Sequence, residues 1–266
     1  MKPLQLTDDM LAVGLKSLGL VSHRLAKIRG MRAEEHDTDA AEATGKEAEI
    51  KDAGEVRIIP IRGIIARDCR GWFPWATDTE ELEELVSEAE NDANVRAVIF
   101  DVDSPGGTVN GVVELCERIA NMKKPTTGYA SGVAASAGYW ILSSCNQILI
   151  RRSTEVGCIG VYSVNLDLSK YYEQIGVTVE MFASSQYKGM GYPGTSLTDA
   201  QRSLVQSDVN GMSEVFSRHV ETNRANSGKI VARESMQGQC FMGDDAVLFG
   251  LADSVVTGID EAVYFA

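Results

Sequence analysis

Residues 131–140 read Ser-Gly-Val-Ala-Ala-Ser-Ala-Gly-Tyr-Trp and mark a passage from strand to helix. The strand-like run Thr126–Ala130 precedes them, and a helix-like run that ends near Ser144 follows. Ser136 lies at the turn, where small neighbours let a substrate backbone approach and a helix N-terminus favours developing negative charge. The stretch predicts an α/β fold and makes Ser136 a candidate nucleophile, although Ala134 replaces the first glycine of a G-x-S-x-G elbow.

The alternation of strand and helix patterns continues on both sides of this stretch. Val95–Val102 is a largely apolar run, typical of a strand buried in a parallel sheet. Such alternation predicts βα units joined by right-handed crossovers. The other expected elements are a strand pair or a bent strand at Val56–Ile65 with Gly63 at the bend, a helix from Asp78 to Glu90, a helix at Val109–Met122, strands at Asn146–Arg151, Val177–Ala183 and Ser254–Thr257, and helices at Leu197–Asn223 and Gly243–Gly250.

The N-terminal part differs in composition from the rest. Leucines recur at helical spacing in residues 1–30, which predicts an amphipathic helical extension that packs on the domain or on a sister subunit. Residues 31–55 are polar and acidic, so we expect a flexible linker there. Residues 56–266 are expected to form the compact domain.

Composition excludes several classes of protein. The chain of 266 residues has a net charge of −13, which argues against non-specific nucleic-acid binding and against docking on an anionic membrane. No run of 18 apolar residues is present, so no membrane anchor is expected. Five scattered cysteines without a C-x-x-C pair indicate reduced thiols in a cytoplasmic protein and no zinc site.

Two further stretches bear on the chemistry. Asp103-Ser104-Pro105-Gly106-Gly107 follows the buried strand, and its glycines allow backbone N–H groups to form an oxyanion hole with that of Ala137, unless it is a simple turn. None of the three histidines follows Ser136 in a nearby loop, which makes a Ser-His-Asp triad improbable. Lys188 is the remaining candidate base, because a desolvated lysine can be neutral, although it also suits an ordinary surface loop.

The three stretches 103–107, 131–140 and 186–191, in this order, resemble the signal peptide peptidase A family of Ser-Lys peptidases. That family includes head maturation proteases of tailed phages and shares the Clp-protease/crotonase-like spiral of βα units. The resemblance implies Ser136 as nucleophile, Lys188 as general base, and Gly107 with Ala137 at the oxyanion. It implies no metal or cofactor.

Residues 157–161 resemble a Gly-Ser-Ile-Gly-Val segment of the same family, which lines the substrate site, and the resemblance implies Gly106 for that site too. Cys158 stands where the family has the serine that orients the lysine, and Gly160 follows it. A thiol is a weaker hydrogen-bond partner than a hydroxyl, so orientation of Lys188 is a point where this chain departs from the pattern. Ser163 and Ser184 are possible substitutes.

The resemblance implies a serine endopeptidase that processes capsid, portal or scaffold proteins during phage head maturation, in the host cytoplasm or in the assembling prohead. It also implies a homo-oligomeric ring. A cytoplasmic peptidase of signal peptides or short peptides is the first alternative. The others are a crotonase-like acyl-CoA enzyme, which uses a similar backbone oxyanion site, and an inactive assembly protein.

Overall fold

The computed structural model describes residues 51–53, 55–69 and 76–266. They divide into two compact units, each described here by itself. The 161–215 unit consists of Val161–Val215, and the sheet unit contains the described residues up to Gly160 together with Phe216–Ala266. The expected domain 56–266 thus corresponds to two units. The expected extension at residues 1–30 lies outside the described residues, as does most of the 31–55 linker.

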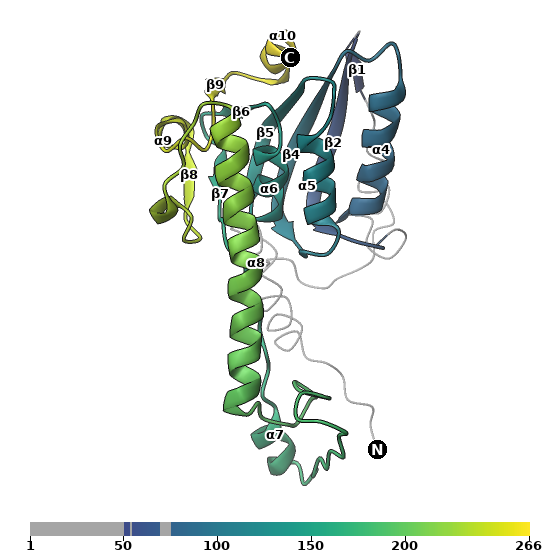
Figure 1. The fold of residues 1–266 in the computed structure, drawn as a ribbon, viewed down its shortest axis with the longest axis vertical. Coiled ribbons are helices and arrows are strands. Elements are labelled where there is room, and N and C mark those ends of the chain that lie inside the picture. Colours follow the sequence, from purple (N-terminus) through teal and green to yellow (C-terminus); the bar gives the residue numbers. More distant parts are fainter. Residues whose placement is uncertain (1–50, 54, 70–75) are drawn as a thin grey trace, which may run out of the picture. The chain divides into compact units, whose positions relative to one another are not determined.

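A mixed sheet forms the sheet unit, with its strands in the order β1-β2-β4-β5-β6-β9 (Figure 1). Parallel pairing joins β2 (Val56–Ala66), β4 (Ala97–Gly107), β5 (Thr126–Ala135), β6 (Gln147–Arg151) and β9 (Ser254–Val256). β1 (Lys51–Ala53) is antiparallel to β2, and β3 (Ala76–Asp78) is parallel to it. Strand structure therefore begins inside the range expected to be linker.

The sheet splits next to the candidate nucleophile. β5 pairs with β6 from Thr127 to Ala130 and then with β7 (Glu155–Gly157) at Ala134 and Ala135. On its other side β7 pairs antiparallel with β8 (Cys240–Met242). β7 consequently lies between the strand that leads to Ser136 and the strand that begins at Cys240.

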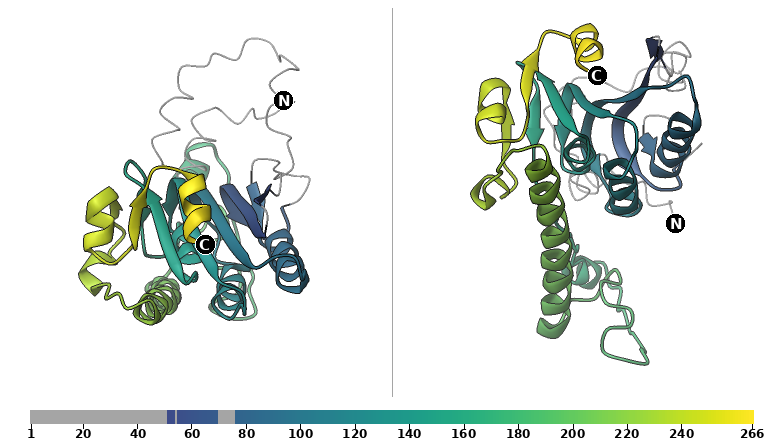
Figure 2. Two further views of the ribbon diagram at one scale, coloured as in Figure 1. Left: turned by 90° about the horizontal axis from the view of Figure 1, so that it is seen from above. Right: turned by 45° about the horizontal axis from the view of Figure 1, so that its top comes forward.

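Neighbouring helices cover the face of the sheet that Figure 1 presents. α4 (Thr79–Asn91) and α5 (Val112–Ala120) run along one face, as Figure 2 shows, and α6 (Ala137–Ser143) packs on β4 and β5. Every residue of α6 is buried, which is typical of a helix inside a core. α10 (Ile259–Phe265) belongs to the core cluster of Ile58, Ile99, Tyr129, Leu149, Val256 and Ala262. Each fully buried aliphatic side chain stabilises the fold by about 1.5–3 kcal/mol.

The long helix α8 (Asp199–Asn226) confirms the helix expected at Leu197–Asn223, and its C-terminal part packs on α6. The Phe216 ring stacks on the Trp140 ring with centroids 4.1 Å apart. The indole Nε1–H of Trp140 donates to Nδ1 of half-buried His219 at 2.7 Å. Fully buried Arg224 donates to the carbonyl of Gly250 and to the Asp253 carboxylate, both at 3.0 Å. These bonds fix the loop between α9 (Gly243–Leu248) and β9.

Two local expectations were wrong. Asp103–Gly107 does not end its strand, because β4 continues to Gly107 and pairs with β2 on one side and with Ala134 of β5 on the other. Val177–Ala183 has the β-branched composition of a strand but forms none. A strand needs a partner edge, and no such pairing is formed by this segment. The bend at Gly63 is confirmed by a shift in the β2–β4 register between Arg62 and Ile64.

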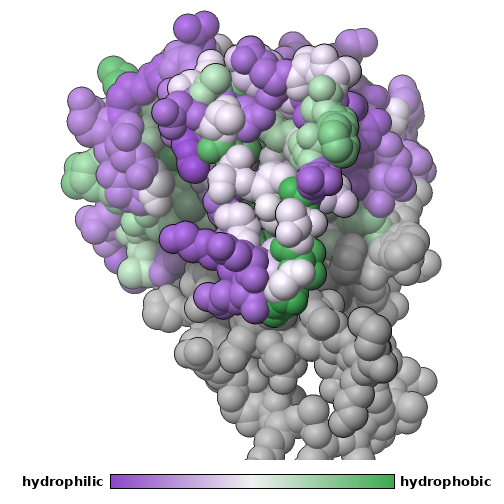
Figure 3. Space-filling view, turned by 90° about the horizontal axis from the view of Figure 1, so that it is seen from below, coloured by the Kyte–Doolittle hydropathy of each residue, from purple (hydrophilic) through white to green (hydrophobic). Residues whose placement is uncertain are grey.

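The 161–215 unit contains α7 (Ser169–Gln174) and the first part of α8. It exposes many large hydrophobic side chains, and the Phe182 ring is 95% exposed. The others are Tyr162, Val164, Leu166, Tyr171, Ile175, Val177, Met181, Tyr187, Tyr192 and Val215. Hydrophobic residues also lie among hydrophilic ones on the molecular face in Figure 3.

Candidate active site

Ser136 occupies a strained turn between β5 and α6. Its φ of 53° and ψ of −123° lie in a region that side chains rarely adopt, which costs about 1–3 kcal/mol. Two hydrogen bonds hold the turn: the Ser136 N–H donates to the carbonyl of Gly157, and the Trp140 N–H donates to the carbonyl of Ser136, both at 2.9 Å. The hydroxyl does not cap α6. Such backbone strain is typical of a serine presented to a substrate.

Gly106 lies directly against this turn. A Cβ atom at Gly106 would stand 2.6 Å from Cβ of Ser136, 2.9 Å from the carbonyl oxygen of Ala135 and 3.1 Å from the amide nitrogen of Ala137. Its φ of +106° also favours glycine. The structure therefore brings together the 103–107 and 131–140 stretches, and glycine at position 106 makes that approach possible.

The two amides expected at the oxyanion are those of Ala137 and Gly107. Ala137 is the first residue of α6, so its N–H has no partner within the helix. Gly107 lies opposite Ile65 in the β2–β4 ladder, where the N–H of Thr108 donates to the carbonyl of Ile65 at 2.9 Å. Since N–H groups alternate in direction along a parallel strand, that of Gly107 is turned away from β2. Their action as an oxyanion hole stays a prediction.

Cys158 and Gly160 lie on the other side of Ser136. Cys158 follows Gly157, the residue whose carbonyl binds the Ser136 amide. Its φ is 52°, and its own N–H donates to the carbonyl of Gln239 at 2.7 Å. A hydrogen bond with the Cys240 thiol lowers the pKa of Cys158 to about 7, against the opposing effect of burial. Gly160 is the last residue before the 161–215 unit.

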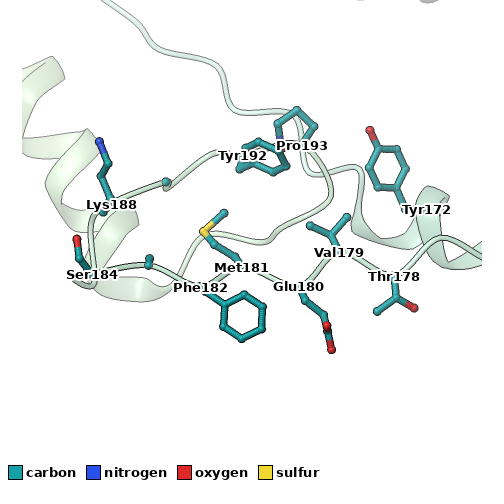
Figure 4. A pocket seen from close by; sticks show the side chains of 12 residues that line it. Tyr172, Thr178, Val179, Glu180, Met181, Phe182, Ser184, Lys188, Tyr192 and Pro193 are labelled. Carbon is teal, nitrogen blue, oxygen red and sulfur yellow. The ribbon is translucent and has the colours of Figure 1, made fainter.

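Lys188 belongs to the 161–215 unit, whereas Ser136 belongs to the sheet unit, so the pairing of the two stays a prediction. The lysine is exposed. It lines a cavity of about 900 Å³ whose other walls include Tyr172, Met181 and Ser184. Figure 4 shows Ser184 and Lys188 together at one end of this cavity, away from Tyr172.

Sequence reasoning missed the buried residues that hold the segments around the Ser136 turn in place. Fully buried Ser104 accepts the amide hydrogen of Gly106 at its Oγ, at 3.1 Å, and a Cβ at Gly138 would stand 3.2 Å from its carbonyl oxygen. Trp140 connects α6, the helix that follows Ser136, to α8 through His219. Strand alternation signals burial of Ser104, but no local pattern reveals a contact with His219, 79 residues away.

The described residues carry neither a metal cluster nor a membrane span. No group of three or more His, Cys, Asp or Glu side chains in the described part of the chain is placed to hold a metal ion. Within residues 51–53, 55–69 and 76–266, no helix is long and apolar enough to cross a bilayer. All five cysteines are free.

Two family models match the sequence. The model described as peptidase family S49 matches residues 118–265, more than half of the chain, and the Clp protease model matches residues 77–153. A membrane-bound stomatin-specific protease, solved as a mutant with a substrate peptide, superposes with a TM-score of 0.50 at 18% identity over 79% of either chain. That likeness, together with the Clp protease match, confirms the expected Clp-protease/crotonase fold.

Curated relatives include viral and bacterial proteases. Capsid assembly protease C of Escherichia phage lambda is 25% identical over 209 residues, which are 77% of this chain and 47% of that protein. A putative signal peptide peptidase of Enterococcus faecium is 29% identical over 169 residues, 62% of this chain and 49% of that protein. The chain thus spans about half the length of these two relatives.

Proposed function

Because the chain belongs to peptidase family S49, a family of serine peptidases, we propose that it cleaves peptide bonds with Ser136 as nucleophile and Lys188 as general base. The strained turn at Ser136, with Gly106 against its Cβ, is the observation that carries this proposal. Such a turn presents the hydroxyl and leaves room on one side for a substrate backbone.

In the proposed reaction, Oγ of Ser136 attacks the carbonyl carbon of the scissile peptide bond while neutral Lys188 accepts its proton at Nζ. The negative charge that forms on the carbonyl oxygen is held by the N–H groups of Ala137 and Gly107. Lys188 then returns the proton to the leaving amine. A water molecule, activated by the same lysine, hydrolyses the acyl-enzyme and restores Ser136.

We further propose that the active form is a homo-oligomer, a closed ring, in which the 161–215 unit is covered by another subunit. Exposed hydrophobic side chains gather in this unit, Phe182 and Tyr192 among them, and such exposure often marks an interface. Lys188 lies among them and is exposed in the single chain. Assembly would remove water from its ammonium group and so favour the neutral base that the reaction needs.

For the substrate, we propose capsid, portal or scaffold proteins of a phage head, cleaved in the host cytoplasm or in the prohead. The name of the lambda relative, a capsid assembly protease, supports this choice. The Enterococcus relative, a putative signal peptide peptidase, supports short peptides as the second candidate.

Incubation with both kinds of substrate, followed by mass spectrometry of the fragments, tests the proposal. Ser136→Ala should abolish cleavage and leave the melting temperature nearly unchanged, because alanine removes only the hydroxyl. Ser131→Ala is the matched control: this half-buried serine lies on β5, and its hydroxyl donates a 3.4 Å bond to the carbonyl of Val102. Cleavage by Ser136→Ala at the wild-type rate would rule out the nucleophile.

A further inference from the structure

Two cysteines face each other across β7 and β8, beside the candidate active site. Gly157 is paired with Cys240 in the antiparallel register, and the N–H of Cys158 donates to the carbonyl of Gln239 at 2.7 Å. Cys158 and Cys240 are therefore offset by one residue on neighbouring strands. Ordinary strand spacing then puts their Cα atoms about 6 Å apart, within the range that a disulfide spans.

Side-chain direction brings the two sulfur atoms together. In a regular ladder, residues offset by one position point to opposite faces of the sheet. Cys158 leaves this alternation, since its φ of 52° is left-handed, and the two thiols are close enough for each to shift the pKa of the other. Cys158 is half-buried and Cys240 is exposed, so a small solute can reach the pair.

We propose that Cys158 and Cys240 are a dithiol modification site that a hydroperoxide oxidises to a disulfide, which switches off the neighbouring serine. The second half of this statement rests on the proposed peptidase function. The first half concerns only the two thiols and is tested without any peptide substrate.

The reaction begins at Cys158. Because the Cys240 thiol donates to it, Cys158 has a pKa of about 7, whereas the same bond and burial raise the pKa of Cys240. The Cys158 thiolate attacks one peroxide oxygen, the O–O bond breaks, and Cys158 becomes a sulfenic acid while the other oxygen leaves as hydroxide. The sulfur of Cys240 then displaces the sulfenic hydroxyl. Two thiols and one hydrogen peroxide thus yield one disulfide and two waters.

The disulfide acts on Ser136 through Gly157. β7 lies between β5 and β8. On one side the carbonyl of Gly157 accepts the amide hydrogen of Ser136, and on the other side the disulfide would join Cys158 to Cys240 of β8. A covalent S–S bond of about 2 Å is much shorter than the hydrogen-bonded contact it replaces and would draw this part of β7 away from β5. A displacement on the order of 1 Å near reacting atoms reduces the rate about 100-fold.

The remaining cysteines provide internal controls. Cys69, Cys116 and Cys145 are buried. Burial raises the pKa of each of these three thiols, so they are poor nucleophiles in the folded protein. Only the Cys158–Cys240 pair should therefore react before the protein unfolds.

The test treats the reduced protein with hydrogen peroxide and maps thiols and cross-linked peptides by mass spectrometry. We expect a loss of two hydrogen atoms and one cross-linked peptide pair containing Cys158 and Cys240, both reversed by dithiothreitol. Cys240→Ala should form no intramolecular cross-link. It should also slow alkylation of Cys158 at pH 7 severalfold, because the Cys158 thiolate loses the thiol that stabilises it.

Peptide cleavage is measured on the same samples. Oxidised wild type should lose about 100-fold in rate and recover with dithiothreitol, while Cys240→Ala should keep its activity through a brief peroxide treatment. Sulfinic acid at Cys158 without a cross-link, or cross-links between chains, would overturn the dithiol site. A disulfide that leaves cleavage unchanged would overturn the switch. A reduced protein without any cleavage would instead refute the proposed function, and the mapping result would still stand.

Discussion

Substitution of alanine for Gly106 tests the geometry of the candidate site most directly. The new Cβ atom would stand 2.6 Å from Cβ of Ser136, whereas carbon atoms in contact prefer about 3.5–4.0 Å. The two segments must separate by about 1 Å. That separation moves the Gly107 amide away from Ala137, and loss of one oxyanion donor reduces kcat about 100- to 1000-fold, which is about 2.7–4 kcal/mol.

The matched control is Gly211→Ala on α8. A Cβ at Gly211 meets no atom within 4 Å, so this change should stabilise the helix by about 1 kcal/mol and leave cleavage unaltered. Gly106→Ala should instead lower stability by about 1–3 kcal/mol, because alanine is strained at a φ of +106°. Urea unfolding gives the stabilities, and initial rates on a cleaved peptide give kcat/KM. A folded Gly106→Ala protein with wild-type kcat/KM would refute the role of this contact.

Three further predictions concern the base, the assembly and α8. Cleavage should increase toward alkaline pH because Lys188 must be neutral, and Lys188→Arg should be inactive; a flat profile with chemistry rate-limiting would contradict a lysine base. Ser136→Ala and Lys188→Ala proteins, each inactive alone, can be mixed and reassembled. The mixture should recover about one quarter of wild-type activity if neighbouring subunits share a site. It should recover none if every subunit holds its own serine and lysine. Burial lowers the pKa of His219 below 6.5, so its contribution to stability is complete above pH 6.5 and decreases as pH falls toward the lowered value. Urea midpoints of His219→Gln, which keeps an acceptor for Trp140, should lack this acid-induced decrease.

The sequence predicted the elements with strong local signals. Asp78 was expected to begin a helix, and its carboxylate accepts the amide hydrogen of Glu80 at 2.8 Å. Ser136 was expected at a tight turn, because small residues follow an apolar strand there, and its backbone is strained as that turn requires. Local composition was sufficient in both cases because the deciding contacts lie within a few residues.

The rest depends on contacts between distant segments. Whether β4 ends at Asp103 or continues to Gly107 is decided by its neighbours β2 and β5, which composition does not specify. The run Val177–Ala183 failed as a strand for the same reason. The proximity of Cys158 and Cys240 could not be predicted from the sequence either. Cys240 belongs to another strand, and cysteine as a residue type does not indicate the left-handed backbone found at Cys158.

The burial of α6 determines when the candidate site can fold during protein synthesis. Two side chains of α6 bind partners that are made much later. His219 is 79 residues beyond Trp140, and the carbonyl of Leu251, which accepts the Tyr139 hydroxyl hydrogen, is 112 residues beyond that tyrosine. At about 5–20 residues per second, a ribosome needs on the order of 4–16 s to reach His219. During that interval the nascent chain carries the proposed nucleophile, Ser136, while α6 lacks these two partners. We therefore expect reactive-serine probes to label released chains and to miss chains arrested before α8.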